Sequence, residues 1–204
     1  GFNPDSGRLR WYSEATSGDQ YSSSVVAVQD VVYSIEGRGG GSTAVRAGGK
    51  GDVTKSHTVW SGRDSSRFGT PVVFEDRVYY FSGSVATCTD AKTGDRIFQG
   101  RVTGSAGGGD DSRGGGGGSS RGGRSGGGGG GDFSSPVVAD GKVYYVQSSG
   151  NVVVLKAGSE FEQLAVNQVT TDREKFGATP AISTGEIFIR SDKHLYCIAE
   201  STGQ

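Results

Sequence analysis

Pro136-Val-Val-Ala-Asp-Gly-Lys-Val-Tyr-Tyr145 is the stretch of sequence that decides the fold. Two short runs of β-branched and aromatic residues flank Asp-Gly in it. This dipeptide favours a type I′ hairpin turn, because both central residues of that turn take a positive φ. The stretch therefore predicts a β-hairpin. Related ten-residue segments begin at Ser24, Pro71 and Pro180.

These four segments recur about every 45 residues once a glycine-rich insertion is set aside, and such a period is typical of β-propeller blades. Around the third segment we expect strands within residues 133–139, 142–146, 152–155 and 161–166. Four antiparallel strands in one repeat make one blade. The sequence therefore predicts an all-β fold, a β-propeller of four-stranded antiparallel blades.

The repeats divide the chain into successive units, so residues 1–204 are expected to form one β-propeller or part of one. The expected order is an outer strand of a preceding or closing blade (1–16), blade 1 (21–64), blade 2 (68–103), a glycine-rich flexible inter-blade loop (104–131), blade 3 (133–167) and the first three strands of blade 4 (176–204). In blade 1 the repeat places the hairpin turn at Val28-Gln29, which has poor turn chemistry.

The size of the ring stays open between two organisations. About four blades are expected, and four is the lower limit for propellers. Residues 7–13 could pair with the 176–204 blade and close a four-bladed ring. Alternatively, these blades are part of a seven- or eight-bladed ring, which is the organisation that we favour.

The charge and hydropathy of the chain exclude two classes of partner. Lys and Arg number 21 against 22 Asp and Glu, and this balance argues against nucleic-acid binding, which requires a positive excess. No run of eighteen apolar residues is present, so no membrane span is predicted. The opening residues show no signal peptide.

The glycine-rich stretch carries three arginines, which could suggest an RNA-binding segment. Asp110 and Asp111 dilute this positive charge, and the stretch has no aromatic residue on which a base could stack. Its composition therefore favours a flexible loop.

Cys88 and Cys197 are the two cysteines, and they occupy equivalent positions in two different repeats. Equivalent positions in separate blades lie further apart than the roughly 7 Å between Cα atoms that a disulfide allows. We therefore expect two free, buried thiols that fill strand positions.

The sequence predicts no catalytic, cofactor-binding or metal-binding residue. His57 and His194 lack the spacing of metal ligands, and His194 is expected at a solvent-facing turn. The segment 37–41 has glycines but not the lysine of a phosphate-binding loop. The serines of the repeats lie outside any nucleophile elbow; they are Ser23, Ser24, Ser134 and Ser135.

Two segments carry a resemblance to a known family, Phe133-Ser-Ser-Pro-Val-Val-Ala-Asp-Gly-Lys-Val-Tyr144 and Cys88-Thr-Asp-Ala-Lys-Thr-Gly-Asp-Arg-Ile-Phe98. They resemble the repeat of the pyrroloquinoline-quinone (PQQ)-like β-propellers. That repeat has a serine-proline pair, two valines, a glycine turn, an aromatic strand, a threonine-glycine corner and a tryptophan. Trp11 and Trp60 match the tryptophan, which docks between blades in the family, whereas Phe98 and Leu164 replace it.

The resemblance implies a non-catalytic scaffold like the outer-membrane-assembly lipoproteins, in a periplasmic, cell-surface or secreted setting in bacteria. Its partners would be proteins bound through inter-blade loops or a sheet edge, with no cofactor. One alternative is the propeller part of a PQQ- and calcium-dependent quinoprotein dehydrogenase. That branch has an adjacent cysteine pair, which this chain lacks. A second alternative is a carbohydrate-binding module that uses Tyr79, Tyr80 and Phe81.

Overall fold

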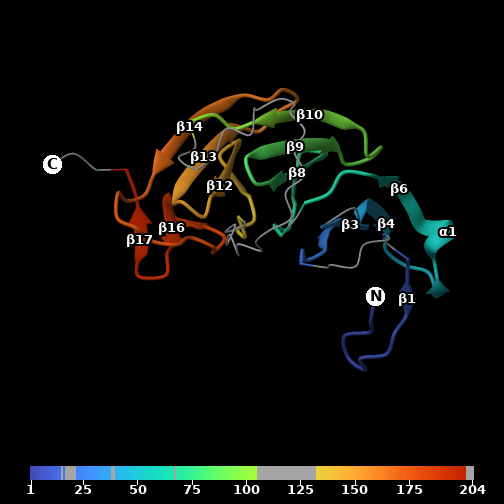
Figure 1. Cartoon of the computed structure of the whole chain (residues 1–204). Helices are drawn as coiled ribbons and strands as arrows, with labels where there is room; N and C mark the ends of the chain where they lie inside the picture. Colours follow the sequence, from blue (N-terminus) through green and yellow to red (C-terminus); the bar gives the residue numbers. More distant parts are fainter. Residues whose placement is uncertain (15, 17–21, 38–39, 67, 105–131, 201–204) are drawn as a thin grey trace, which may run out of the picture.

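The computed structural model describes the chain except residues 15, 17–21, 38–39, 67, 105–131 and 201–204, and its sheets follow one another in an arc (Figure 1). Nearly all of the predicted glycine-rich loop and part of the 176–204 unit therefore lie outside the described residues. Three sheets have four antiparallel strands each and a fourth has three. The predicted all-β fold of four-stranded antiparallel blades is confirmed.

The strands of each blade follow in chain order from the inner edge outward, except for a short insertion in blade 1. Blade 1 contains β2 (Val26–Val28), β3 (Val31–Glu36), β4 (Gly41–Arg46) and β6 (Thr58–Gly62). Blade 2 contains β7 (Val72–Phe74), β8 (Arg77–Ser82), β9 (Val85–Asp90) and β10 (Arg96–Arg101). Blade 3 contains β11 (Val137–Ala139), β12 (Lys142–Val146), β13 (Asn151–Lys156) and β14 (Gln163–Gln168), and blade 4 contains β15 (Ala181–Ser183), β16 (Glu186–Arg190) and β17 (Leu195–Ile198).

The N-terminal strand does not pair with blade 4. Instead β1 (Trp11–Tyr12) pairs in parallel with β5 (Gly51–Asp52), which belongs to the insertion between β4 and β6. Blade 4 and the N-terminal strand lie at opposite ends of the arc (Figure 1). The closed four-bladed ring is therefore not the arrangement of this structure.

The insertion in blade 1 also contains the helix α1 (Thr54–His57), which has four residues. Among the described residues, no helix has the length and apolar character needed to cross a membrane.

The turn between the first two strands explains why each repeat begins as a hairpin. Asp140 and Gly141 have φ values of 49° and 64°, as a type I′ turn requires. The turns of blades 2 and 4 also have two positive φ values each. In blade 1 the expectation of a turn at Val28-Gln29 is wrong, since the turn lies at Gln29-Asp30, where Gln29 takes a φ of 53°. The shift by one residue keeps Val28 in β2 and puts Asp30 in the turn, so turn chemistry prevails over the alignment of the repeats.

The hydrophobic cores lie between the blades, not within one central cluster. On β8, Val78 and Tyr80 pack with blade 1, whereas Tyr79 and Phe81 pack with blade 3. Successive side chains of a strand point to opposite faces of its sheet. A strand between two blades is thus buried on both faces, which explains the continuous apolar run Val78–Phe81.

At the inner edge, a hydroxyl group links each blade to the one before it. The backbone N–H of Ser24 donates to Thr70 Oγ1 at 3.0 Å, and that of Thr70 donates to Ser135 Oγ at 2.9 Å. The N–H of Ser135 in turn donates to Thr179 Oγ1 at 3.0 Å. Thr70, Ser135 and Thr179 each directly precede a proline. We call this series the hydroxyl relay, because one repeat position supplies both the donor and the acceptor.

At the outer edge, Trp60 of β6 docks onto the corner that connects β9 to β10. Its indole Nε1–H donates to the Ala91 carbonyl oxygen at 2.9 Å. Gly94 lies under the ring with a φ of 78°, and a Cβ atom there would lie 2.6 Å from the ring. The structure therefore places Trp60 between two blades, as the resemblance implied.

Replacing this glycine tests the docking. Gly94→Ala should destabilise the fold by about 2–4 kcal/mol. Alanine is strained in the left-handed backbone conformation of this position, and its Cβ atom would also clash with the Trp60 ring. Gly7 is the matched control: it has a φ of 65° at a similar corner, but a Cβ atom added there would meet nothing within 4 Å. Gly7→Ala should cost only about 1–2 kcal/mol. If urea unfolding gave the same loss of unfolding free energy for both variants, it would contradict the contact between Gly94 and Trp60.

Candidate functional site

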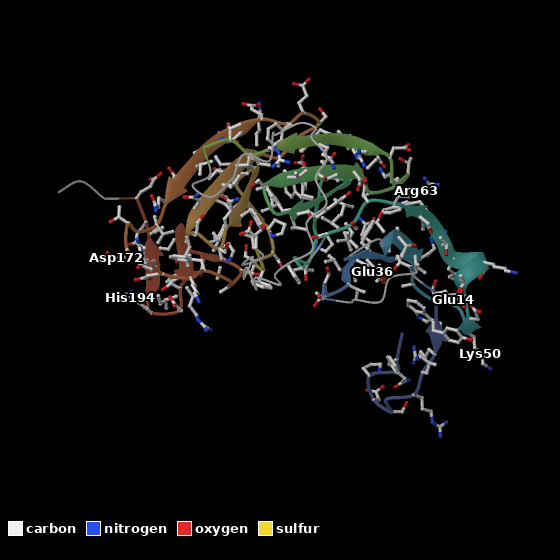
Figure 2. All side chains as sticks on the ribbon, in the orientation of Figure 1. Glu14, Glu36, Lys50, Arg63, Asp172 and His194 are labelled. Atoms are coloured by element: carbon white, nitrogen blue, oxygen red, sulfur yellow. The ribbon has the colours of Figure 1, made fainter. Side chains whose placement is uncertain are left out.

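The most elaborate polar site lies at the blade 4 end, where an inter-blade segment meets a hairpin turn. The segment 169–180 connects β14 to β15, and the turn 191–194 connects β16 to β17. The backbone N–H of Lys175 donates to Asp192 Oδ1 at 2.9 Å, and the N–H of Asp192 donates to the Lys175 carbonyl at 2.9 Å. Figure 2 shows Asp172 and His194 from these two segments at the same end of the arc.

Glu174 holds the two segments together with a buried carboxylate. Its Oε1 lies 2.7 Å from His194 Nδ1, and its Oε2 accepts a hydrogen bond from the Tyr196 hydroxyl at 2.9 Å. The Glu174 side chain is 1% exposed, whereas that of His194 is 61% exposed. The carboxylate is therefore a structural anchor with one partner open to solvent.

The electrostatics of this anchor favour an ionised Glu174. A hydrogen bond from the Ser191 side chain is the largest influence that lowers the pKa of Glu174, joined by Tyr196 and His194 and opposed by burial. Burial, followed by the hydrogen bond to Glu174, raises the pKa of the Tyr196 hydroxyl. Hydrogen bonds to the charged form stabilise that form. The carboxylate thus stays negative while Tyr196 stays protonated.

Beside the anchor lies an open cavity of about 320 Å³. Lys175 and Arg190 line it, and within the described part of the chain neither side chain has a hydrogen bond or an ion pair. Asp192 also lines the cavity and is already bonded to the Lys175 amide. Two unpaired cations suit a carboxylate or another oxyanion on a partner. The arrangement can bind such an anionic group. Ser191 also lines the cavity, but its hydroxyl oxygen accepts hydrogen bonds from the N–H groups of Lys193 and His194 within the turn.

The structure does not bring together the histidines considered in the sequence. His57 lies in α1 with Nδ1 2.8 Å from Ser56 Oγ, far along the arc from His194 (Figure 1). His194 does lie at a turn and is largely exposed, but it is bonded to Glu174. No sequence pattern marks Glu174, because its contacts with His194 in the turn and Tyr196 on β17 span 20 and 22 residues of the sequence.

The repeat serines have structural roles. The Ser134 hydroxyl donates to the Val146 carbonyl in the buried interior, and Ser135 belongs to the hydroxyl relay. Ser24 donates its N–H to the same relay. Ser23 Oγ is buried and has no hydrogen-bond partner among the described residues.

The prediction of two buried thiols is correct for Cys88 and wrong for Cys197. Both cysteines are free, but only Cys88 is buried. Burial raises the pKa of the Cys88 thiol to about 12. Cys197 occupies the same repeat position on β17, opposite Phe188 just as Cys88 is opposite Tyr79. Its exposure follows because the described residues place no blade against this face.

Three aromatic residues considered for carbohydrate binding are core residues. The exposed fractions of Tyr79, Tyr80 and Phe81 are 1%, 2% and 4%. Phe81 stacks on Tyr145 of blade 3 with ring centroids 4.1 Å apart. These rings cannot form an exposed sugar platform, so the residues that suggested the carbohydrate-binding alternative do not support it.

No group of three or more His, Cys, Asp or Glu side chains in the described residues could hold a metal ion. Asp110 and Asp111 lie outside the residues that the structure describes. Neither cysteine has an adjacent cysteine, because Cys88 and Cys197 lie in different blades. The residues that are described therefore do not fit a calcium-bound quinone.

Comparison with known proteins places the chain in a family. A model of the family described as outer membrane protein assembly factor BamB matches residues 1–114, more than half of the chain. The chain belongs to this family of PQQ-like propellers. No curated protein sequence matches it significantly.

Solved structures share the fold at low sequence identity. BamB from Moraxella catarrhalis superposes with a TM-score of 0.59 and 16% identity over 97% of this chain and 52% of its own. The quinohemoprotein alcohol dehydrogenase ADHIIG from Pseudomonas putida HK5 has a TM-score of 0.55 and 13% identity over 90% of this chain and 30% of its own. The computationally designed Ika4 protein has a TM-score of 0.51 and 7% identity over 92% and 98% of the two chains. The chain thus spans about half of the BamB structure and less of the dehydrogenase.

The Glu174 anchor predicts a pH-dependent stability. Because the folded pKa lies below the usual 4.5, the ionised carboxylate stabilises the fold above that pH, and this contribution is lost as the pH falls through the lowered value. Glu174→Gln should therefore lower the Tm at neutral pH, and the difference from the parent protein should shrink in acid. Glu160→Gln, at an exposed position, is the control. A Tm difference independent of pH would contradict the role of the charge.

Proposed function

We propose that this chain is a non-catalytic PQQ-like β-propeller scaffold that binds a protein partner in an exported bacterial protein. The observation that carries the proposal is the cavity beside Glu174, with its two unpaired cations, Lys175 and Arg190. It lies on an inter-blade segment, where propellers can vary sequence without disturbing the blades. Membership of the BamB family supports a partner-binding role in outer membrane protein assembly.

The anchor makes this segment suitable for recognition. Glu174, buried and bonded to two side chains, fixes the segment that carries Lys175. A binding loop held in one conformation loses less conformational entropy when a partner binds. We propose an acidic side chain or a terminal carboxylate of the partner as the group that enters the cavity.

We propose a periplasmic or cell-surface location, as the family description implies. Cys197 is exposed on the blade 4 sheet, so labelling of its thiol in intact cells by a maleimide that does not cross the inner membrane tests this location.

The second candidate is the propeller part of a PQQ- and calcium-dependent dehydrogenase. The likeness to the ADHIIG structure favours it. The described residues lack an acidic cluster for calcium, and the chain lacks an adjacent cysteine pair. We therefore place this function second.

A crosslinking experiment tests the scaffold. A photoreactive amino acid at Ala178, which lines the cavity, should crosslink one specific envelope protein in the source bacterium. Lys175→Glu in the same chain should remove that crosslink, because it places a negative charge opposite the partner's carboxylate. Arg101→Glu, a charge reversal on an exposed outer strand, should leave it unchanged.

Calorimetric titration with calcium and then PQQ separates the two candidates. The scaffold predicts no saturable heat for either ligand, with a known quinoprotein dehydrogenase as positive control. Stoichiometric PQQ binding that depends on calcium would overturn the scaffold in favour of the dehydrogenase.

A further inference from the structure

The hydroxyl relay places the segments that lead into blades 2, 3 and 4 side by side. One repeat position therefore recurs as a row across these three segments. Two residues before each relay hydroxyl, this position holds Phe68, Phe133 and Gly177 in turn. The row thus has two aromatic rings followed by a residue without a side chain.

Phe133 carries an exposed aromatic ring in the middle of this row. Its ring packs against that of Phe68, with centroids 4.7 Å apart and planes inclined by 41°. Phe133 is nevertheless 52% exposed, and no other aromatic ring pairs with it in the described residues. An apolar group that covered this ring would be removed from water together with it, which is favourable.

Gly177 leaves open the place that a third ring of the row would fill. A Cβ atom at Gly177 would lie 4.0 Å from the Cβ atom of Phe133, and apart from its chain neighbours no other described atom lies within 4 Å. Gly177 is exposed, and it lines the cavity beside Glu174. A side chain that entered above Gly177 would therefore pack on Phe133 without displacing either residue.

Lys175 lies on the same side of its segment as this open place. Between Lys175 and Gly177, Phe176 is 3% exposed and pairs with Ser191 as an isolated antiparallel bridge. Side chains alternate in direction along an extended backbone, so Lys175 and the space above Gly177 both lie opposite the buried Phe176 ring. Two residues of extended chain span about 7 Å. Asp192 holds the Lys175 backbone, and the ammonium group has no ion pair in the described part of the chain.

An exposed ring and a cation at this spacing suit a ligand that carries both an aromatic side chain and a carboxylate. Its ring would pack on Phe133 above Gly177, and aromatic pairs gain free energy beyond the area that they bury. Its carboxylate would accept a charge-assisted hydrogen bond from Lys175. One residue of a peptide, or two neighbouring residues, can supply both groups.

We propose that the cavity takes a peptide segment in which an aromatic side chain adjoins a carboxylate, with the ring on Phe133 and the carboxylate at Lys175. This inference rests on the proposed function, and it names the chemistry by which the scaffold recognises its partner. The carboxylate is that of a chain terminus or that of an acidic residue next to the aromatic one. The site then selects its partner by the ring as well as by the charge.

A nuclear magnetic resonance titration of the full chain tests this two-part site. The probes are acetyl-glycyl-glycyl-phenylalanine, with a terminal carboxylate, and acetyl-glycyl-phenylalanyl-glutamyl-glycinamide, with a side-chain carboxylate. At least one should shift the amide signals of Phe133 and Gly177 in a saturable manner, and the tighter of the two identifies the source of the carboxylate. Alanine in place of phenylalanine in that peptide should weaken binding about two- to tenfold. Its counterpart with an amide in place of the carboxylate should bind about tenfold more weakly or less.

Two positions of the row provide the variants. Gly177 does not have a left-handed φ, so Gly177→Phe should fold, place its own ring on Phe133 and abolish saturable binding. Ser22→Phe is the matched control, because Ser22 holds the same repeat position before blade 1, next to Phe68 and away from the cavity. Phe133→Ala should weaken binding about two- to tenfold, whereas Phe133→Tyr keeps the ring and should bind as the parent protein does. Thermal unfolding checks that each variant folds.

The outcomes separate this inference from the scaffold itself. Equal affinity for the phenylalanine and alanine peptides, or parental binding by Phe133→Ala, would overturn the role of the ring and leave the cationic cavity of the scaffold in place. No saturable binding of either probe would overturn the inference as well. The crosslink from Ala178, which depends on Lys175 and on the natural partner, tests the scaffold independently of both peptides.

Discussion

The bond from a backbone N–H to the hydroxyl of the next blade is the constraint on which this arc depends. Thr70 and Ser135 each accept such a bond from one blade and donate to the next. The bond fixes the distance between the inner strands, and the following proline fixes the direction in which each strand leaves. Once the distance and direction of the inner strands are fixed, neighbouring sheets pack against each other through their faces. The cores between blades and the inter-blade segments above them follow from this arrangement.

Because the cores lie between blades, the exposure of a side chain depends more on the adjacent blade than on its position in its own repeat. Cys88 and Cys197 occupy one repeat position, yet blade 3 buries the first and the second is exposed. The same contrast separates Ala86, 1% exposed, from Leu195, 69% exposed. Stability in such proteins is a sum of repeat and neighbour contributions.

Local chemistry explains which features the sequence could predict. The Asp140-Gly141 turn and the alternating strands around it depend on neighbouring residues, so the hairpins and the blades were predictable. The place of Trp60 between blades was implied only by the family resemblance. The turn at Gln29-Asp30 was misplaced by one residue, because the alignment of the repeats put Val28 into it, whereas turn chemistry favours Asp30. The Glu174 anchor was not predictable, because it joins an inter-blade segment to a turn and a strand that are distant in the sequence. The parallel pairing of β1 with β5 likewise arises from an insertion with no counterpart in the other repeats that the structure describes.

Amide hydrogen exchange, resolved by residue, is the most direct test of the hydroxyl relay. Exchange reports whether an N–H group is held in a hydrogen bond that opens rarely. The relay predicts slow exchange at Thr70 and Ser135, whose amides are bound to hydroxyl groups. Exchange at Thr70 and Ser135 as fast as at the exposed turn residue Gly185 would contradict it. The blades would then be held together by their apolar faces alone.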